Sequence, residues 1–392
     1  MSKKMCGVVA LGALCGLSLS LLNCGSTVNR SSGLLYVLSQ GSNNVESYAI
    51  NLTSGNLSLI NSNASTCATA PCGLPADVVL DPASSVAFVL NAGGGGVPAS
   101  IYGYKVNSDG SLGKGSDVMD FANDMAVAMV RDPGGKFLFV ITQGAQLYAL
   151  TTQSGSTSLS LASQKTLTRI PTGIAAIPGP NSTVLLYVTS NKDLAGTNDN
   201  TVSEFAVDAS GSVTEQVGSP YPTASNPSAV VAVATSPIGG SGGLFVYVTN
   251  VTTNSISAYQ VCTVQTATCT QQNVSDLTLL PVGTPVNAGS NPAAMVVDPK
   301  SNFLYVASKI SNQVFGFRIN ATQGTLSALS PANMSTGLAP TALAMHSSGK
   351  FLFVSNNGSS NISSFTLDTT SGAMSSPLTV TSSAQPAGLV SK

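Results

Sequence analysis

Short apolar runs separated by Gly, Pro, Ser, Thr and Asn fill the chain from residue 33 onward. One run, an aliphatic residue followed by an aromatic residue and Val, recurs at intervals of 48 to 60 residues. Its seven copies are Leu35–Val37, Ala87–Val89, Leu138–Val140, Leu186–Val188, Val246–Val248, Leu304–Val306 and Leu352–Val354, with Ala replacing the aliphatic residue once. Apolar runs of this length between turn residues predict β-strands.

Each copy is surrounded by three further predicted strands. A strand with its own aromatic residue follows it, then a turn containing Gly and a third short strand. Glycine at such turns supplies the positive φ that tight hairpins need. A strand of small apolar residues, in most copies introduced by Pro, precedes each aromatic run after the first. Four strands per unit at a period near 50 residues is typical of a β-propeller.

The two ends of the repeat complete each other. The last segment, Gln385–Val390, is a Pro-led small-residue strand without an aromatic strand after it, whereas the first unit starts at Gly33 without an inner strand. Pairing the last strand with the first unit closes the ring by hydrogen bonding and leaves no exposed ends. We therefore predict an all-β, seven-bladed propeller over residues 33–392. An outer-membrane barrel needs longer strands, and tandem sandwiches need about 100 residues per module.

Two stretches resemble a known family. Tyr247–Asn250 reads Tyr-Val-Thr-Asn, and Asp298–Val306 has the form Asp-Pro-x-x-x-Phe-Leu-Tyr-Val. These resemble the YVTN-repeat, lactonase-family seven-bladed propellers, which include 6-phosphogluconolactonase-like and muconate-cyclase-like proteins. The resemblance covers residues 33–392 and implies the fold. It implies lactonase activity only weakly, because the matching residues belong to strands and turns.

The N-terminal segment predicts export. Lys3 and Lys4 precede an apolar stretch from Met5 to Leu22, which is the arrangement of a signal peptide. Residues 1–23 are therefore assigned to a signal peptide and residues 24–32 to a tether. Leu21–Cys24 resembles a bacterial lipobox in which Cys24 is lipidated, although Asn23 departs from the usual small residue. Cleavage without a lipid and an uncleaved anchor remain alternatives to a lipid-anchored protein of the cell envelope.

Four cysteines remain beyond the leader. Cys67 and Cys72 lie close in sequence, as do Cys262 and Cys269, and in an oxidising compartment we expect each pair to close a local disulfide loop. Neither spacing matches a zinc knuckle. We predict no metal and no cofactor.

Charge narrows the possible functions. Charged residues make up 8% of the chain, 15 basic and 16 acidic, with a formal net charge of −1. Nucleic-acid binding needs clustered cations and is not expected. The chain has one His, His346, which lies at a turn position filled by Asp81, Asp132 and Asp298 in other units, so we expect a turn residue on the face opposite the ligand face.

Candidate site residues lie where inter-blade connections and the turns after the aromatic strands gather around the axial channel. Asp77, Asp124 and Arg169 come from consecutive blades, with Lys165 nearby in the same connections. They could form ion pairs between blades or a small-molecule site. Asn recurs in the turns at Asn43, Asn200, Asn254 and Asn312, where turn formation and ligand contact are both open. We predict no catalytic residues among them.

The sequence favours a monomeric, non-catalytic binding module of the cell envelope. Abundant Ser, Thr and Asn at low charge indicate a small molecule, a saccharide or an envelope protein as the partner. The alternatives are a lactone hydrolase or muconate-cyclase-like enzyme, which rests on the resemblance, and a purely structural role.

Overall fold

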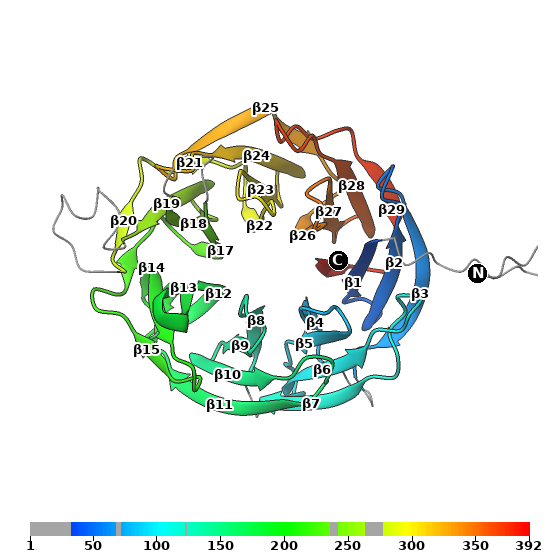
Figure 1. Cartoon of the computed structure of the whole chain (residues 1–392), viewed down its shortest axis with the longest axis horizontal. Coiled ribbons are helices and arrows are strands. Elements are labelled where there is room, and N and C mark those ends of the chain that lie inside the picture. Colours follow the sequence, from blue (N-terminus) through cyan, green and yellow to red (C-terminus); the bar gives the residue numbers. More distant parts are fainter. Residues whose placement is uncertain (1–32, 68–71, 122–123, 236–241, 263–276) are drawn as a thin grey trace, which may run out of the picture.

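The computed structural model describes residues 33–67, 72–121, 124–235, 242–262 and 277–392. Seven antiparallel sheets surround a central axis, and each has four strands in order from the axis outward, with two sheets carrying an additional short strand. Figure 1 looks down this axis and shows the sheets arranged as a ring. The predicted all-β, seven-bladed propeller is confirmed.

Blade 1 contains β30 and β1–β3, and blades 2 to 7 follow in chain order. The innermost strands are β4 (Pro75–Leu80), β8 (Ala126–Arg131), β12 (Arg169–Pro178), β17 (Pro227–Ala234), β22 (Pro292–Val297), β26 (Pro340–Met345) and β30 (Pro386–Ser391). The second strands carry the repeated aromatic runs and are β1 (Gly33–Ser39), β5 (Val86–Asn91), β9 (Phe137–Thr142), β13 (Val184–Asp193), β18 (Leu244–Asn250), β23 (Phe303–Ser308) and β27 (Phe351–Asn356).

The outer half of each blade is more variable. The third strands are β2 (Asn44–Ile50), β6 (Ala99–Lys105), β10 (Gln146–Thr152), β14 (Asn198–Val207), β19 (Ser255–Val261), β24 (Gln313–Ile319) and β28 (Asn361–Thr366). The outermost strands are β3 (Leu57–Ser65), β7 (Ser116–Phe121), β11 (Leu159–Thr166), β15 (Val213–Glu215) with β16 (Tyr221–Pro222), β20 (Leu279–Pro281) with β21 (Val286–Asn287), β25 (Leu326–Ser335) and β29 (Leu378–Thr381). One 3₁₀ turn, η1 (Pro180–Ser182), joins β12 to β13.

The ring closes through its first and last strands, as predicted. β30 pairs antiparallel with β1, with Tyr36 opposite Val390 and Val37 opposite Leu389. Glu46 of β2 adds a second connection, because its Oε1 accepts hydrogen bonds from the Ser383 backbone at 2.9 Å and from the Ser383 hydroxyl. The closure therefore unites residues more than 300 positions apart in the chain.

Seven hydrophobic clusters hold the ring together, and each combines residues from two adjacent blades. The cluster between blades 7 and 1, for example, contains Phe353 and Val37, both fully buried. Burial of apolar area is the main source of stability, so blade-to-blade packing fixes the number of blades.

Hydrogen bonds from the repeated tyrosines also join neighbouring blades. The hydroxyls of Tyr36, Tyr247 and Tyr305 donate to the carbonyls of Gly110, Gly324 and Gly372, each in the outer hairpin of the next blade. Gly324 and Gly372 have φ of +70° and +78°, and a Cβ there would overlap the ring of Phe245 or Phe303. The glycines of the turns and the aromatic residues of the second strands, which were recognised separately in the sequence, thus form one contact between blades.

Disulfide predictions are confirmed as far as the described residues reach. Cys67 and Cys72 are bonded to each other, and Cys262 is disulfide-bonded. Cys269, the partner predicted for Cys262, lies outside the described residues, as do the signal peptide, the tether and Cys24. Within the described residues, no helix has the length and apolar character to cross a membrane.

Candidate functional site

The predicted face around the channel mouth is built by a repeated asparagine contact. Asn254 and Asn312 adopt positive φ in the turns between second and third strands, which explains the choice of Asn there. Their Oδ1 atoms accept hydrogen bonds from the backbone N–H of Asn291 and Ala339, at the entrance to the next blade. Asn200 makes the same contact with Asn226 at 2.7 Å. Asn254 and Asn312 therefore act both as turn residues and as inter-blade connectors, whereas Asn200 lies within β14 and acts as a connector.

Asn43 follows the same turn geometry. Its φ is +49°, and its backbone carbonyl accepts hydrogen bonds from the backbone and the hydroxyl of Thr66. The turn interpretation is confirmed for Asn43, Asn254 and Asn312, whereas Asn200 lies within β14 and its φ is not positive. Ligand contact is not needed to explain their recurrence.

Blade 4 carries the charged part of this face. β13 and β14 each have ten residues, whereas their counterparts in other blades have six or seven, and β12 is lengthened with them. The added length pairs Arg169 with Asp193 and Lys192 with Asn198. We call Arg169, Lys192, Asp193 and Asp199 the charged lip.

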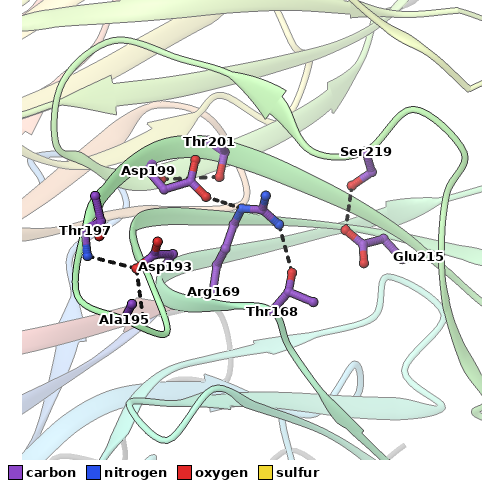
Figure 2. Close-up of polar contacts among 9 residues, drawn as sticks. All are labelled: Thr168, Arg169, Asp193, Ala195, Thr197, Asp199, Thr201, Glu215 and Ser219. Atoms are coloured by element: carbon purple, nitrogen blue, oxygen red, sulfur yellow. Dashed lines mark hydrogen bonds and ion pairs between the residues drawn. The ribbon is translucent and has the colours of Figure 1, made fainter.

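Arg169 forms an ion pair within this lip. Its Nε lies 2.5 Å from Asp199 Oδ2, and its Nη1 donates to Thr168 Oγ1 at 2.8 Å. Figure 2 shows the guanidinium between these two partners. Both side chains of the ion pair keep about a quarter of their surface exposed, at 23% and 29%. Nη2 has no hydrogen-bond partner among the described residues, so it can still donate to an oxygen of a ligand.

The other carboxylates near the charged lip accept hydrogen bonds from neighbouring residues of blade 4. Asp193 Oδ1 accepts hydrogen bonds from the backbone N–H groups of Ala195 and Thr197, which fixes the tip of the β13–β14 hairpin. Glu215 in β15 accepts a hydrogen bond from Ser219, as Figure 2 shows. Asp199 is thus the partner of Arg169, and sequence reasoning missed it. The signal was its place next to Asn200, the blade 4 counterpart of the turn asparagines.

Asp77 lies in the wall of the channel. It occupies a position of β4 where the innermost strands of the other blades have Ala or Gly. Its Oδ2 accepts a hydrogen bond from the Met129 backbone of β8 at 3.0 Å, and its Oδ1 accepts one from Val78 at 2.8 Å. Burial between the two inner strands raises the pKa of the Asp77 carboxyl to about 6, despite the hydrogen bonds that lower it.

The structure does not bring Asp124 and Lys165 together with Arg169 in one site. Asp124 Oδ1 accepts a hydrogen bond from Gly144 at 2.8 Å and fixes the β9–β10 turn of its own blade. Lys165 lies within β11, the outermost strand of blade 3, opposite Leu147, and not in the inter-blade connection where we expected it. Ion pairs between neighbouring blades were also expected, but the ion pair of Arg169 forms within blade 4. Asp77, Asp124 and Arg169 do come from consecutive blades.

The remaining candidate groups have structural contacts. His346 lies in the β26–β27 turn, as predicted, and its Nδ1 contacts the Ser348 backbone and hydroxyl. Burial lowers the pKa of this imidazole. Arg131 donates to the Leu80 and Gly135 carbonyls, and Arg318 lies 4.8 Å from the ring centroid of Phe303. Within the described residues, no group of three or more His, Cys, Asp or Glu side chains could hold a metal ion.

Comparison with known proteins agrees with this architecture. Residues 240–388 match the family described as "Lactonase, 7-bladed beta-propeller". The resemblance to lactonase-type propellers is confirmed. No match was found among curated protein sequences.

Solved structures share the fold at low sequence identity. The periplasmic gluconolactonase of Pseudomonas aeruginosa superimposes with a TM-score of 0.71 at 16% identity, over 92% of this chain and 98% of that one. A Bacteroides fragilis protein provisionally called a 6-phosphogluconolactonase gives 0.69 at 14% identity, over 92% and 98%. A functionally unknown protein of Desulfotomaculum acetoxidans gives 0.63 at 17% identity, with the same coverage. At such identities the likeness shows the fold.

Proposed function

We propose that this protein is a non-catalytic binding propeller of the cell envelope that holds a ligand or partner on its channel-mouth face. The observation that carries the proposal is that the candidate site residues already form hydrogen bonds or an ion pair within the protein. Asp77 holds the backbone of β8, Asp124 holds Gly144, and Arg169 is paired with Asp199. A general base or an oxyanion donor must instead keep its reactive atom available to substrate.

Arg169 is the group on this face that we expect to contact the partner. Arg169 begins β12 and pairs with Asp193 of the lengthened β13, in which the neighbouring Lys192 is exposed, and its Nη2 is free to donate. A guanidinium already oriented by one carboxylate loses little conformational entropy when it donates to a further oxygen. A small molecule, a saccharide or an envelope protein with carbonyl or hydroxyl oxygens would suit it.

Export and a lipid anchor are part of the proposal. The disulfide between Cys67 and Cys72 supports an oxidising compartment, and the Pseudomonas aeruginosa neighbour is described as periplasmic. Lipidation of Cys24 is tested by metabolic labelling with radioactive palmitate and membrane fractionation. We expect label and membrane association in the native chain and neither in Cys24→Ala. Unlabelled native protein would refute the anchor.

Lactone hydrolysis, or a muconate-cyclase-like reaction, is the second candidate. It is favoured by the carboxyl of Asp77, because a pKa near 6 in a channel wall lies in the range that suits a general base. The structural neighbours described as gluconolactonases add to this candidate.

One experiment separates the two functions. The soluble Cys24→Ala protein is incubated with 6-phosphogluconolactone, gluconolactone and muconolactone, and acid release is compared with buffer alone. We expect no acceleration. Acceleration that is lost in both Asp77→Asn and Arg169→Ala would establish the enzyme and overturn the non-catalytic proposal. Introduced into the soluble Cys24→Ala protein, Arg169→Ala should reduce the capture of partners from envelope extract. Its melting temperature should stay nearly unchanged.

A further inference from the structure

A pocket of about 350 Å³ opens between blades 5 and 6, away from the charged lip of blade 4. Its lining is uncharged and includes the turn residue Asn254 of blade 5, the β21–β22 connection of the same blade, and strands β24 and β25 of blade 6. The residues used below are Asn254, Asn287, Ser290, Ser311, Phe315 and Ala328. The volume is at the lower end of the range for small-ligand pockets.

An irregularity in the outermost strand creates the hollow. Phe315 pairs with Asn333 and Phe317 pairs with Ala328, so four residues of β25 pass opposite Gly316. Such a bulge bends the strand away from its partner and opens space beside it. Gly289 then allows the β21–β22 connection to pass close to the aromatic ring. Its φ is +80°, and a Cβ there would lie 2.3 Å from Phe315 Cε2.

Phe315 differs from its counterparts in the other blades. The position opposite the repeated Val is occupied by Glu46, Tyr102, Tyr148, Ser203, Ser257, Phe315 and Ser363. The ring of Tyr148 packs against Phe121 at 4.9 Å, and that of Tyr102 packs against Tyr104 at 5.2 Å. Phe315 has no aromatic partner among the described residues, is only partly buried, and lines the pocket.

Polar atoms around Phe315 are fixed so that donors remain available. Asn254 Oδ1 accepts a hydrogen bond from Asn291 N–H at 3.0 Å, and Asn287 Oδ1 accepts one from Gly289 N–H at 2.8 Å. The carbonyl end of each amide is therefore assigned, and each Nδ2 has no hydrogen-bond partner within the described residues. Ser311 Oγ accepts a hydrogen bond from Ser290 N–H at 2.7 Å, which leaves its hydroxyl proton free to donate.

We infer that this pocket binds one ring of a neutral saccharide. The negative face of an aromatic ring attracts the weakly positive C–H groups of a pyranose, and amide and hydroxyl donors match its ring of hydroxyl oxygens. No charged side chain lines the pocket to hold a phosphate, a carboxylate or an amine. This inference goes beyond the proposed function, because the pocket is separate from Arg169 and does not depend on what the charged lip binds.

Saturation-transfer NMR tests the inference on the soluble Cys24→Ala protein. The probes are methyl glycosides of neutral hexoses and N-acetylhexosamines and their disaccharides, at millimolar concentration, where single-ring ligands of this kind are expected to bind. Isothermal titration calorimetry then measures the affinity of the strongest binder. We expect at least one probe to bind, with little change in affinity between low and high salt, since screening acts on charges.

Matched variants locate the site. Phe315→Leu keeps the apolar bulk but removes the ring, and we expect a loss of about tenfold or more in affinity, which corresponds to about 1.4 kcal/mol. Phe315→Tyr keeps the ring and should bind nearly as well as the native protein. Lys165→Ala, in the outermost strand of blade 3 and outside the pocket lining, should leave saccharide binding unchanged. Melting curves are measured for all variants to check that each retains the fold.

Three results would overturn the inference. They are the absence of binding by every probe, binding that Phe315→Leu leaves intact, and binding that Lys165→Ala weakens as much as Phe315→Leu does. None of them bears on whether Arg169 recruits a partner from envelope extract, so failure of this inference and failure of the proposed function can be told apart.

Discussion

Asp77 gives a quantitative test of how the channel wall is stabilised. It is an acidic residue at a position that is Ala or Gly in the other blades, and burial raises the pKa of its carboxyl from 3.8 to about 6. One pKa unit corresponds to 1.36 kcal/mol, so the ionised carboxylate destabilises the native state by up to about 3 kcal/mol. Asp77 is only partly buried, so solvent screening reduces this value, and we expect about 1 to 2 kcal/mol.

The sign of the pH dependence follows from linkage. Because the native state binds the proton more tightly than the unfolded state, the stability associated with Asp77 is fully present below its unfolded pKa of about 4. It decreases as the pH rises toward 6 and is constant above that value. Asp77→Ala removes this dependence and also removes the hydrogen bond to Met129, at a cost of about 1 kcal/mol.

We therefore expect the more stable of the two proteins, the native chain or Asp77→Ala, to depend on the pH. Urea unfolding of the disulfide-intact protein is measured at several pH values between about 3.5 and 7.5, a window that brackets both pKa values of the carboxyl. We expect the variant to be less stable at the acidic end and more stable at neutral pH. Since all other titrating groups are common to both proteins, the difference isolates Asp77. A difference that does not vary with pH, or that varies in the opposite direction, would refute the buried-carboxyl argument.

Three further substitutions test contacts between blades. Asn312→Ala removes the hydrogen bond to the next blade and places Ala at a φ of +54°, so we expect a loss of about 2 kcal/mol in unfolding free energy. Gly173→Ala would bring a Cβ within 2.3 Å of the Ser228 carbonyl oxygen, and we expect about 2 to 3 kcal/mol of destabilisation from overpacking. Tyr305→Phe removes the hydroxyl that donates to Gly372 at 2.8 Å and leaves that carbonyl unpaired, with an expected loss of about 1 to 2 kcal/mol.

Thermal and urea unfolding measure all three, and each has its own control. Asn312→Gly keeps the positive φ at little strain and should recover part of the loss seen with Ala, whereas equal losses would mean that φ is irrelevant. Thr172→Ala, beside Gly173, should be milder than Gly173→Ala. Tyr36→Phe should resemble Tyr305→Phe, since Tyr36 makes the same contact with Gly110. A Tyr305→Phe protein as stable as the native chain would show that this hydroxyl contributes nothing.

The blades and their closure could be predicted because the necessary signals are local and repeated. Pro and small residues mark inner strands, aromatic residues mark second strands, and Gly marks the outer turns. The unmatched strand at Pro386 and the missing strand before Gly33 then required a pairing between them, which the structure has. His346 could be placed by its register with Asp298, because both occupy the same turn of the repeat.

Side-chain partners could not be predicted in the same way. Asp199 pairs with Arg169 because β13 and β14 extend beyond the length of their counterparts, and the repeat does not encode that extension. Lys165 was misplaced because only the structure shows how far β11 continues. Phe315 was missed for a related reason, since a bulge in β25 and not the residue itself makes its ring accessible.

The distribution of charge divides the channel-mouth face into two parts with different binding behaviour. Asp124, Arg169, Lys192 and Asp199 lie in blades 3 and 4, whereas Lys309 is the charged residue in the described turns and connections of this face in blades 5 to 7. A charged partner held at the charged lip should dissociate as salt screens the charges, because the Debye length falls to about 3 Å at 1 M. A ligand held by Phe315 and neutral amides should not. Binding to the native protein that weakens as salt is added therefore points to the charged lip before any variant is made.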